Sequence, residues 1–267
     1  MYHEHWGLER SPFAGGEAPP LFYEGESQTE ALARLRFVVR GRQNAMLLGE
    51  RGVGKSLLAR RFADQCRREG GDVAAVNAAG LSPREFLWQV AAQLAVGPAP
   101  TDDVPRLFRR LAEYAAAARW RSSAAALLVD DADQAGPDVR AQLLRLLGLR
   151  TSAGGWLALV LAASGPTCNR VGEDLLEAID LRIDLTPWSE AEMTGYVQHA
   201  LLEAGGEQPV FQDEALSAMF LLTDGLPRRV NRLADHALLG GAAAGLEMID
   251  AGMIEAAHEA IGWTATA

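Results

Sequence analysis

The stretch from Gly49 to Ser56 constrains the fold of this chain more strongly than any other feature. Its sequence, Gly-Glu-Arg-Gly-Val-Gly-Lys-Ser, matches the phosphate-binding loop pattern, in which one glycine and four variable residues precede Gly-Lys-Ser or Gly-Lys-Thr. Such a loop works only between a strand and a helix, because its N–H groups and the positive end of the helix must surround one anion. The apolar run at 45–48 predicts that strand, and the helical pattern at 57–63 predicts that helix.

Each part of the loop predicts a different contact with a bound polyphosphate. The glycines let the backbone turn tightly and aim its N–H groups inward. Lys55 adds a positive charge for the β- and γ-phosphates, and the Ser56 hydroxyl suits Mg²⁺. The residues that we expect to contact the nucleotide are Gly49, Glu50, Arg51, Gly52, Val53, Gly54, Lys55, Ser56 and Leu57. The strand and helix on either side disfavour the alternative, a glycine-rich turn that binds nothing.

A second stretch, from Ala124 to Asp131, is an apolar run that ends in two acids. A strand that is buried in a parallel sheet has such a continuous apolar sequence, and ligands bind at the carboxyl ends of these strands. We expect Asp130 to hold Mg²⁺ through water and Asp131 to act as the general base. In the alternative, the two acids only cap the turn before the next predicted helix, at 132–149, and the upstream phosphate loop argues against this.

Strands alternate with helices as far as residue 186, and only helices follow. This order predicts a doubly covered parallel α/β sheet at 27–186 and an all-helical lid at 187–267. Ser27 with Glu30 forms a predicted capping box at the start of the first helix. The expected strands are 45–48, 72–77, 124–131, 156–163 and 181–185, and the expected helices are 27–40, 57–63, 83–94, 104–118, 132–149, 189–203, 212–222, 227–240 and 250–261. Residues 1–26, rich in glycine, proline and aromatics, are expected to form a strap that packs on the body or closes over the nucleotide base.

The net charge, the cysteines and the length of the apolar runs narrow the classes of function. A net formal charge of −10 and a pI of about 5.0 argue against a dedicated nucleic-acid binder, although the arginine pairs at 60–61 and 67–68 are compatible with a local basic strip. The two cysteines have no metal-ligand spacing, and the sequence contains neither a signal-peptide pattern nor an apolar run long enough to cross a bilayer. We therefore expect a cytoplasmic protein without direct membrane insertion.

Taken in order, these motifs resemble an AAA+ ATPase. Ser164 ends the fourth expected strand, where the family places a polar sensor 1 residue, and the lid sequence Gly-Leu-Pro-Arg-Arg-Val-Asn at 225–231 is similar to sensor 2. By position, Arg228 is the arginine that the resemblance directs at the γ-phosphate, so Asp131, Lys55, Arg228 and Ser164 form the implied catalytic set. The opening Trp-Gly-Leu at 6–8 and Pro-Phe at 12–13, with this lid sequence, resemble the general secretion pathway protein A subgroup, which is related to origin-recognition/Cdc6-like and transposition-regulator ATPases.

The resemblance implies that ATP and Mg²⁺ bind between the α/β domain and the lid. It also implies ATP-dependent homo-oligomers in which a neighbour contributes an arginine. Hydrolysis would then remodel or position a protein partner in a cytoplasmic or membrane-associated assembly.

Three departures from the family pattern point to slow hydrolysis with ATP binding retained. Asp131 replaces the usual glutamate, and Ser164 replaces the usual asparagine or glutamine. The expected finger position holds Ala178, which leaves Arg182 or Arg170 as candidates for the arginine finger. A largely non-hydrolysing nucleotide switch and a DNA-linked ATPase of the transposition-regulator type are the alternative functions.

Overall fold

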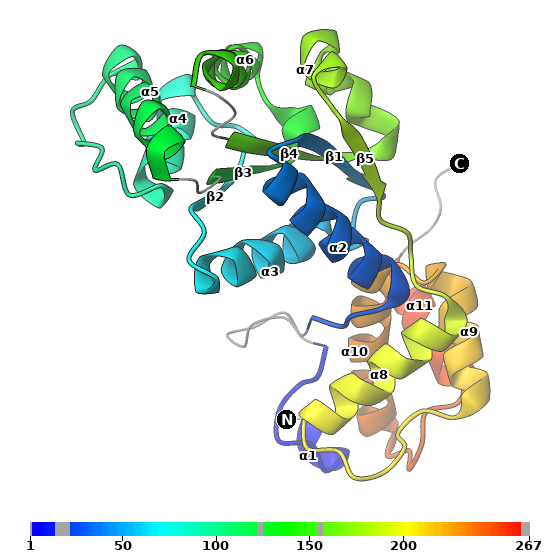
Figure 1. The fold of residues 1–267 in the computed structure, drawn as a ribbon. Coiled ribbons are helices and arrows are strands. Elements are labelled where there is room, and N and C mark those ends of the chain that lie inside the picture. Colours follow the sequence, from blue (N-terminus) through cyan, green and yellow to red (C-terminus); the bar gives the residue numbers. More distant parts are fainter. Residues whose placement is uncertain (1, 14–21, 122–124, 154–156, 263–267) are drawn as a thin grey trace. The chain divides into compact units, whose positions relative to one another are not determined.

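The computed structural model describes residues 2–13, 22–121, 125–153 and 157–262 (Figure 1). The chain forms two compact units. The first, which we call the α/β unit, is Glu26–Leu185. The second, the helical unit, combines Met1–Gly25 with Thr186–Ala267, so the first residues of the chain cluster with its last helices.

The α/β unit is built on a five-stranded sheet in which neighbouring strands run parallel. The strand order is β2-β3-β4-β1-β5. The strands are β1 (Asn44–Gly49), β2 (Val73–Asn77), β3 (Ala125–Asp130), β4 (Leu157–Ser164) and β5 (Leu181–Asp184). This confirms the predicted parallel sheet. Residues 124 and 156, where two strands were expected to begin, lie outside the described residues.

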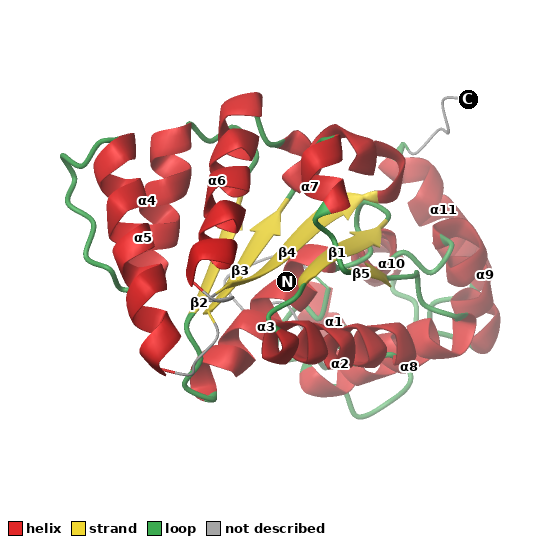
Figure 2. Cartoon of the chain, turned by 45° about the horizontal axis from the view of Figure 1, so that its top comes forward, coloured by secondary structure: helices red, strands yellow, loops and turns green. Residues whose placement is uncertain are grey.

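Helices cover both faces of this sheet (Figures 1 and 2). One face is covered by α2 (Glu26–Gly41) and α3 (Lys55–Arg68), and the other by α4 (Pro83–Gln93), α5 (Val104–Arg121) and α6 (Pro137–Ala153). The central strands are therefore apolar on both sides, which is why their sequences are continuous hydrophobic runs.

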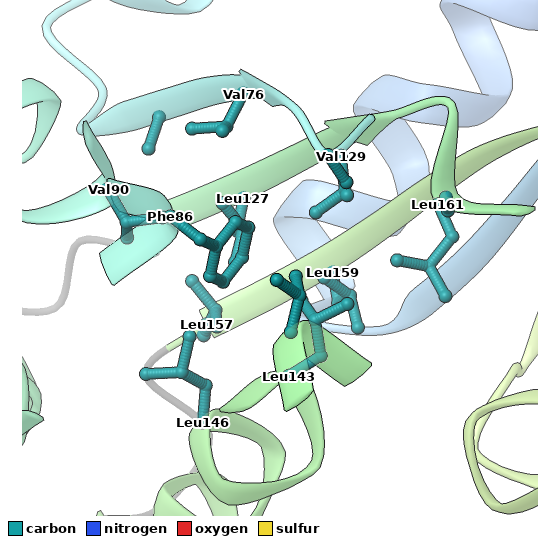
Figure 3. Close-up of a cluster of buried hydrophobic side chains, with 14 of the residues drawn as sticks. Val76, Phe86, Val90, Leu127, Val129, Leu143, Leu146, Leu157, Leu159 and Leu161 are labelled. Carbon is teal, nitrogen blue, oxygen red and sulfur yellow. The ribbon is translucent and has the colours of Figure 1, made fainter. Parts of the chain in front are cut away.

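The larger core lies on the face covered by α4, α5 and α6. Figure 3 shows Phe86 of α4 and Leu143 of α6 packed against Leu127 and Leu159 of the sheet. Each of these side chains is almost completely buried, and burying a side chain of this size contributes about 1.5–3 kcal/mol to folding. This packing holds the carboxyl ends of the strands in fixed positions.

Several element boundaries differ from the sequence prediction. The first long helix, α2, begins at Glu26, so Ser27 lies inside its first turn and the predicted N-cap is wrong. The single helix predicted at 132–149 is interrupted: a 3-10 turn, η1 (Ala132–Gln134), precedes α6, which begins at Pro137. Proline disfavours helical geometry in the residue before it and suits the first position of a helix, which explains the break.

Between β4 and β5, two short helical segments were not predicted. They are η2 (Gly165–Val171) and α7 (Glu173–Glu177), which both follow β4. In contrast, the predicted cap at Ser82 and the predicted box at Ser189 are confirmed, because each serine accepts a hydrogen bond from the backbone N–H three residues later.

The helical unit contains four long helices and the N-terminal segment. The helices are α8 (Glu190–Glu203), α9 (Asp213–Thr223), α10 (Pro227–Ala244) and α11 (Ala251–Ile261), and a short α1 (Tyr2–His5) opens the chain. Leu8 and Phe13 are buried in the core of this unit, and the Trp6 indole N–H donates to the Leu238 carbonyl at 2.9 Å. The described part of the expected strap is thus packed into the helical unit.

Candidate nucleotide-binding site

The phosphate loop joins β1 to α3, as the sequence predicts. Gly54 has a φ of 108°, in the left-handed region that favours glycine, and it immediately precedes α3. Gly49 is needed for another reason: a Cβ there would lie 2.6 Å from the Leu185 carbonyl oxygen and 2.8 Å from Val53 Cγ1. One glycine therefore permits the turn, and the other permits close packing at the base of the loop.

Lys55, the first residue of α3, is folded back against the loop. The residue is only 8% exposed, and Nζ donates to the carbonyl oxygens of Gly49 at 2.8 Å and Glu50 at 3.0 Å. Among the described residues, no side chain caps the start of α3. The N–H groups of its first turn and the Lys55 ammonium therefore form a positive site, which suits a phosphate group.

Ser56 and Asp130 both line a cavity of about 120 Å³ between α3 and the sheet, whose other lining residues are mostly apolar. Ser56 is the second residue of α3, and Asp130 is the last residue of β3. The strand register brings Asn77, the last residue of β2, opposite Asp130. Hydroxyl and carboxylate oxygens are the ligands that Mg²⁺ prefers, so the Ser56 and Asp130 side chains fit this ion.

Asp131 is held by a neighbour that the sequence analysis missed. Its carboxylate Oδ2 accepts a hydrogen bond from Asn77 Nδ2 at 2.9 Å, and its backbone is left-handed, with a φ of 49°. Asn77 could have been found from its position, because a polar residue that ends a buried strand lies at the same edge as the other site residues. The hydrogen bond directs the Asp131 carboxylate toward the end of β2.

Ser164 ends β4 and pairs in register with Gly49 of β1. It is 9% exposed, at the same edge of the sheet as Asp130. Just beyond it, the Thr167 hydroxyl donates to Asp133 Oδ2, and this contact joins the turns that follow β3 and β4. Sequence reasoning missed this pair as well, since Asp133 lies where a continuous helix was predicted and Thr167 lies in a segment whose structure was not predicted.

The three candidate arginines have different surroundings. Arg182 donates to Asp184 through Nε and Nη2, at 2.7–2.9 Å, so its guanidinium is already paired with a carboxylate. Arg170, in η2, is exposed and has no acidic partner among the described residues. In the helical unit, Arg228 is the second residue of α10, and it too is exposed without an acidic partner in the described part of the chain.

Comparison with known proteins agrees with this geometry. The family model described as "AAA domain" matches residues 39–165, which contain the phosphate loop, Asp130 and Ser164. A curated relative, General secretion pathway protein A of Aeromonas hydrophila, is 30% identical over 98% of this chain. Residues 39–165 therefore form an AAA domain, within a phosphate-loop AAA+ fold. The chain spans 49% of the length of that relative, so the AAA+ chain corresponds to about half of the larger protein.

Solved structures also have this AAA+ fold. The Aeropyrum pernix ORC1 protein in complex with DNA has a TM-score of 0.68 at 18% identity, over 94% of this chain and 68% of that one. Drosophila ORC bound to DNA has a TM-score of 0.71 at 20% identity, over 98% of this chain and 67% of that one. At such identities the likeness shows the fold alone. Within the described residues of this AAA+ chain, no helix is long and apolar enough to span a membrane.

Proposed function

We propose that this AAA+ chain binds Mg-ATP at the phosphate loop and hydrolyses it slowly. One observation supports the proposal most directly: Lys55, Ser56, Asp130 and Asp131 gather at one edge of the sheet, but Asp131 is hydrogen-bonded to Asn77. Lys55, Ser56, Asp130 and Asp131 supply the groups that phosphoryl transfer needs, and the hydrogen bond from Asn77 restrains Asp131.

Binding would use groups that already converge. The backbone N–H groups of residues 49–57 and the Lys55 ammonium would hold the phosphates, after Lys55 exchanges its carbonyl partners for phosphate oxygens. Ser56 and Asp130 would hold Mg²⁺, which neutralises charge on the phosphate oxygens when it is bound. Arg228 would contact the γ-phosphate, and Ser164 would hydrogen-bond to it or to the attacking water.

Hydrolysis would depend on Asp131 as the acceptor of the proton of that water. An aspartate is one methylene shorter than the glutamate usual in the family, and the Asn77 amide competes for the same carboxylate. A misplacement of about 1 Å can reduce the rate on the order of 10²-fold. For an arginine supplied to a neighbouring copy, Arg170 is better suited than Arg182, because Arg182 is already paired with Asp184.

The proposed cycle would couple ATP to assembly. We infer that bound ATP favours homo-oligomers, and that the oligomer acts on a protein partner in a cytoplasmic or membrane-associated assembly. The similarity to a protein named for the general secretion pathway supports a protein partner. A nucleotide switch that hardly turns over is the second candidate, and the Asn77–Asp131 hydrogen bond favours it.

Three measurements test the proposal on wild-type protein and on Lys55→Ala, with Arg106→Ala, an exposed α5 residue, as the control. They are ATP affinity by calorimetry, phosphate release, and mass by light scattering with and without Mg-ATP. We expect tight binding, slow release and an ATP-dependent rise in mass in the wild type and control, and none of these in Lys55→Ala. Undetectable ATP binding would overturn the proposal. Fast turnover that is lost in Lys55→Ala would contradict the assignment of a weakened site, and no turnover would favour the switch.

A further inference from the structure

The positive charge of this acidic chain is concentrated in one segment. Residues 34–68 contain ten basic and two acidic side chains, a net charge of +8. Because the whole chain carries −10, the other 232 residues carry −18. Only part of this segment, around Lys55, belongs to the phosphate loop.

The fold gathers the remaining charges on one side of the α/β unit. Helices α2 and α3 cover the same face of the sheet (Figures 1 and 2). These two helices contact each other. Burial and then the charge of Glu69 raise the pKa of the Cys66 thiol, whereas Arg36 of α2 and Arg67 of α3 act to lower it. We call the exposed side of these two helices the arginine face; its exposed arginines are Arg34, Arg40, Arg60, Arg61, Arg67 and Arg68.

The folded chain neutralises this face only in part. Arg34 pairs with Glu30, near the N-terminal end of α2, and Arg67 pairs with Asp64. Arg40 and Arg60 have no acidic partner among the described residues. Exposed ion pairs contribute little to stability, so fold stability does not explain a concentration of arginines here.

An aromatic side chain lies between two of these arginines along α2. Phe37 is 63% exposed, although it lies on a helix whose buried side is packed with Leu35 and Val38. It is one helical turn from both Arg34 and Arg40, and residues three apart on a helix share a face. Arginines together with an exposed aromatic side chain are the groups with which an interfacial helix contacts a membrane surface.

We propose that the arginine face docks on a membrane surface that contains anionic lipids. Such a surface presents phosphate groups above an apolar layer, so arginines can bind the headgroups while Phe37 enters the boundary beneath them. A nucleic-acid duplex offers the phosphates without an exposed apolar layer, so it explains the arginines and leaves Phe37 unexplained. The contact is peripheral and requires no spanning helix, and it does not depend on ATP hydrolysis.

The test is co-sedimentation of the full chain with vesicles of phosphatidylglycerol and phosphatidylcholine, compared with vesicles of phosphatidylcholine alone. We expect binding only to the anionic vesicles, weakened by high salt. An arginine near an anionic surface contributes about fivefold to partitioning, so Arg40→Gln/Arg68→Gln should reduce it about 30-fold. The control Arg106→Gln/Arg109→Gln removes the same charge from exposed residues of α5. It should reduce binding by no more than about twofold, because only the long-range effect of net charge is lost.

Phe37 provides the second arm of the test. Phe37→Ser should reduce partitioning at least about tenfold, whereas Leu221→Ser, at a residue of the helical unit that is 76% exposed, should not. Unchanged thermal midpoints would show that both variants fold. Failure of wild-type protein to bind anionic vesicles would overturn the proposal. Equal losses of vesicle binding in the arginine-face and control variants would also overturn it. So would the finding that these arginines bind only a fluorescent DNA duplex or an acidic protein.

Discussion

Replacing Asp131 with glutamate tests whether the length of this side chain limits hydrolysis. The carboxylate now reaches the Asn77 amide at 2.9 Å, at the end of β2. One more methylene extends its reach by roughly 1 Å. If that distance separates the base from the attacking water, correcting it should raise the rate by up to about 10²-fold, which corresponds to about 2.7 kcal/mol of transition-state stabilisation.

The same substitution has a structural cost. Asp131 has a φ of 49°, and aspartate tolerates this left-handed conformation better than glutamate does. We therefore expect Asp131→Glu to lower the free energy of unfolding by on the order of 1 kcal/mol while it accelerates hydrolysis. Urea unfolding measures the first effect and separates it from the second.

The assay is steady-state phosphate release at saturating Mg-ATP, compared among wild type, Asp131→Glu and Asp131→Asn. The asparagine variant keeps the size of the side chain and removes the base, so it should be slower than wild type. Asn77→Ala should also be faster than wild type, because it frees the carboxylate. If the folded glutamate variant binds ATP normally and hydrolyses it no faster than wild type, the length of Asp131 is not what limits the rate.

Three further predictions concern other parts of the α/β unit. Gly49→Ala should destabilise the fold by about 1–3 kcal/mol in urea unfolding, because its Cβ would lie 2.6 Å from the Leu185 carbonyl oxygen. Asp133→Ala should cost about 1.5–3 kcal/mol by the same measurement, since it removes the acceptor of the Thr167 hydroxyl, and Thr167→Ser, which retains that hydroxyl, should be close to wild type. The pKa of Asp102 is lowered, first by the hydrogen bond from a backbone N–H and then by an arginine, so its contribution to stability is complete above the unfolded pKa of about 3.9 and is lost as pH falls through the lower folded value. Thermal melts from pH 7 to pH 2 should therefore show Asp102→Asn less stable than wild type at neutral pH, with the difference shrinking in acid; a constant difference would contradict this linkage.

The sequence predicted those parts of the site whose residues are close along the chain. The phosphate loop and the two acids each follow a buried apolar strand, so one local pattern identified both the element and its edge. The place of Asn77 at this edge follows from its strand, but its contact with Asp131 was missed because it depends on the register of β2 and β3, which is a property of the folded sheet. The Asp133–Thr167 contact was missed for a similar reason, since it joins turns that are 34 residues apart in the chain.

Boundaries were predicted well where a local signal is strong. Ser82 and Ser189 begin their helices as expected, because each side chain bonds to the backbone of its own first turn. At Ser27 the same residue types are present, but α2 starts one residue earlier, so Ser27 lies inside the helix. Whether the first turn extends past a capping residue depends on what packs against it, which sequence pattern does not contain.

Helix α3 joins the phosphate loop to the arginine face. Its first residue, Lys55, faces the phosphate loop, and its last, Arg68, lies on the arginine face. Fourteen residues at 1.5 Å per residue form a rod of about 20 Å, with Phe62 fully buried midway along it against the sheet. A tilt that moves one end of this helix therefore also moves the other end. If occupation of the phosphate loop tilts α3, it must change the affinity of the arginine face, and docking on that face must change nucleotide affinity by the same factor.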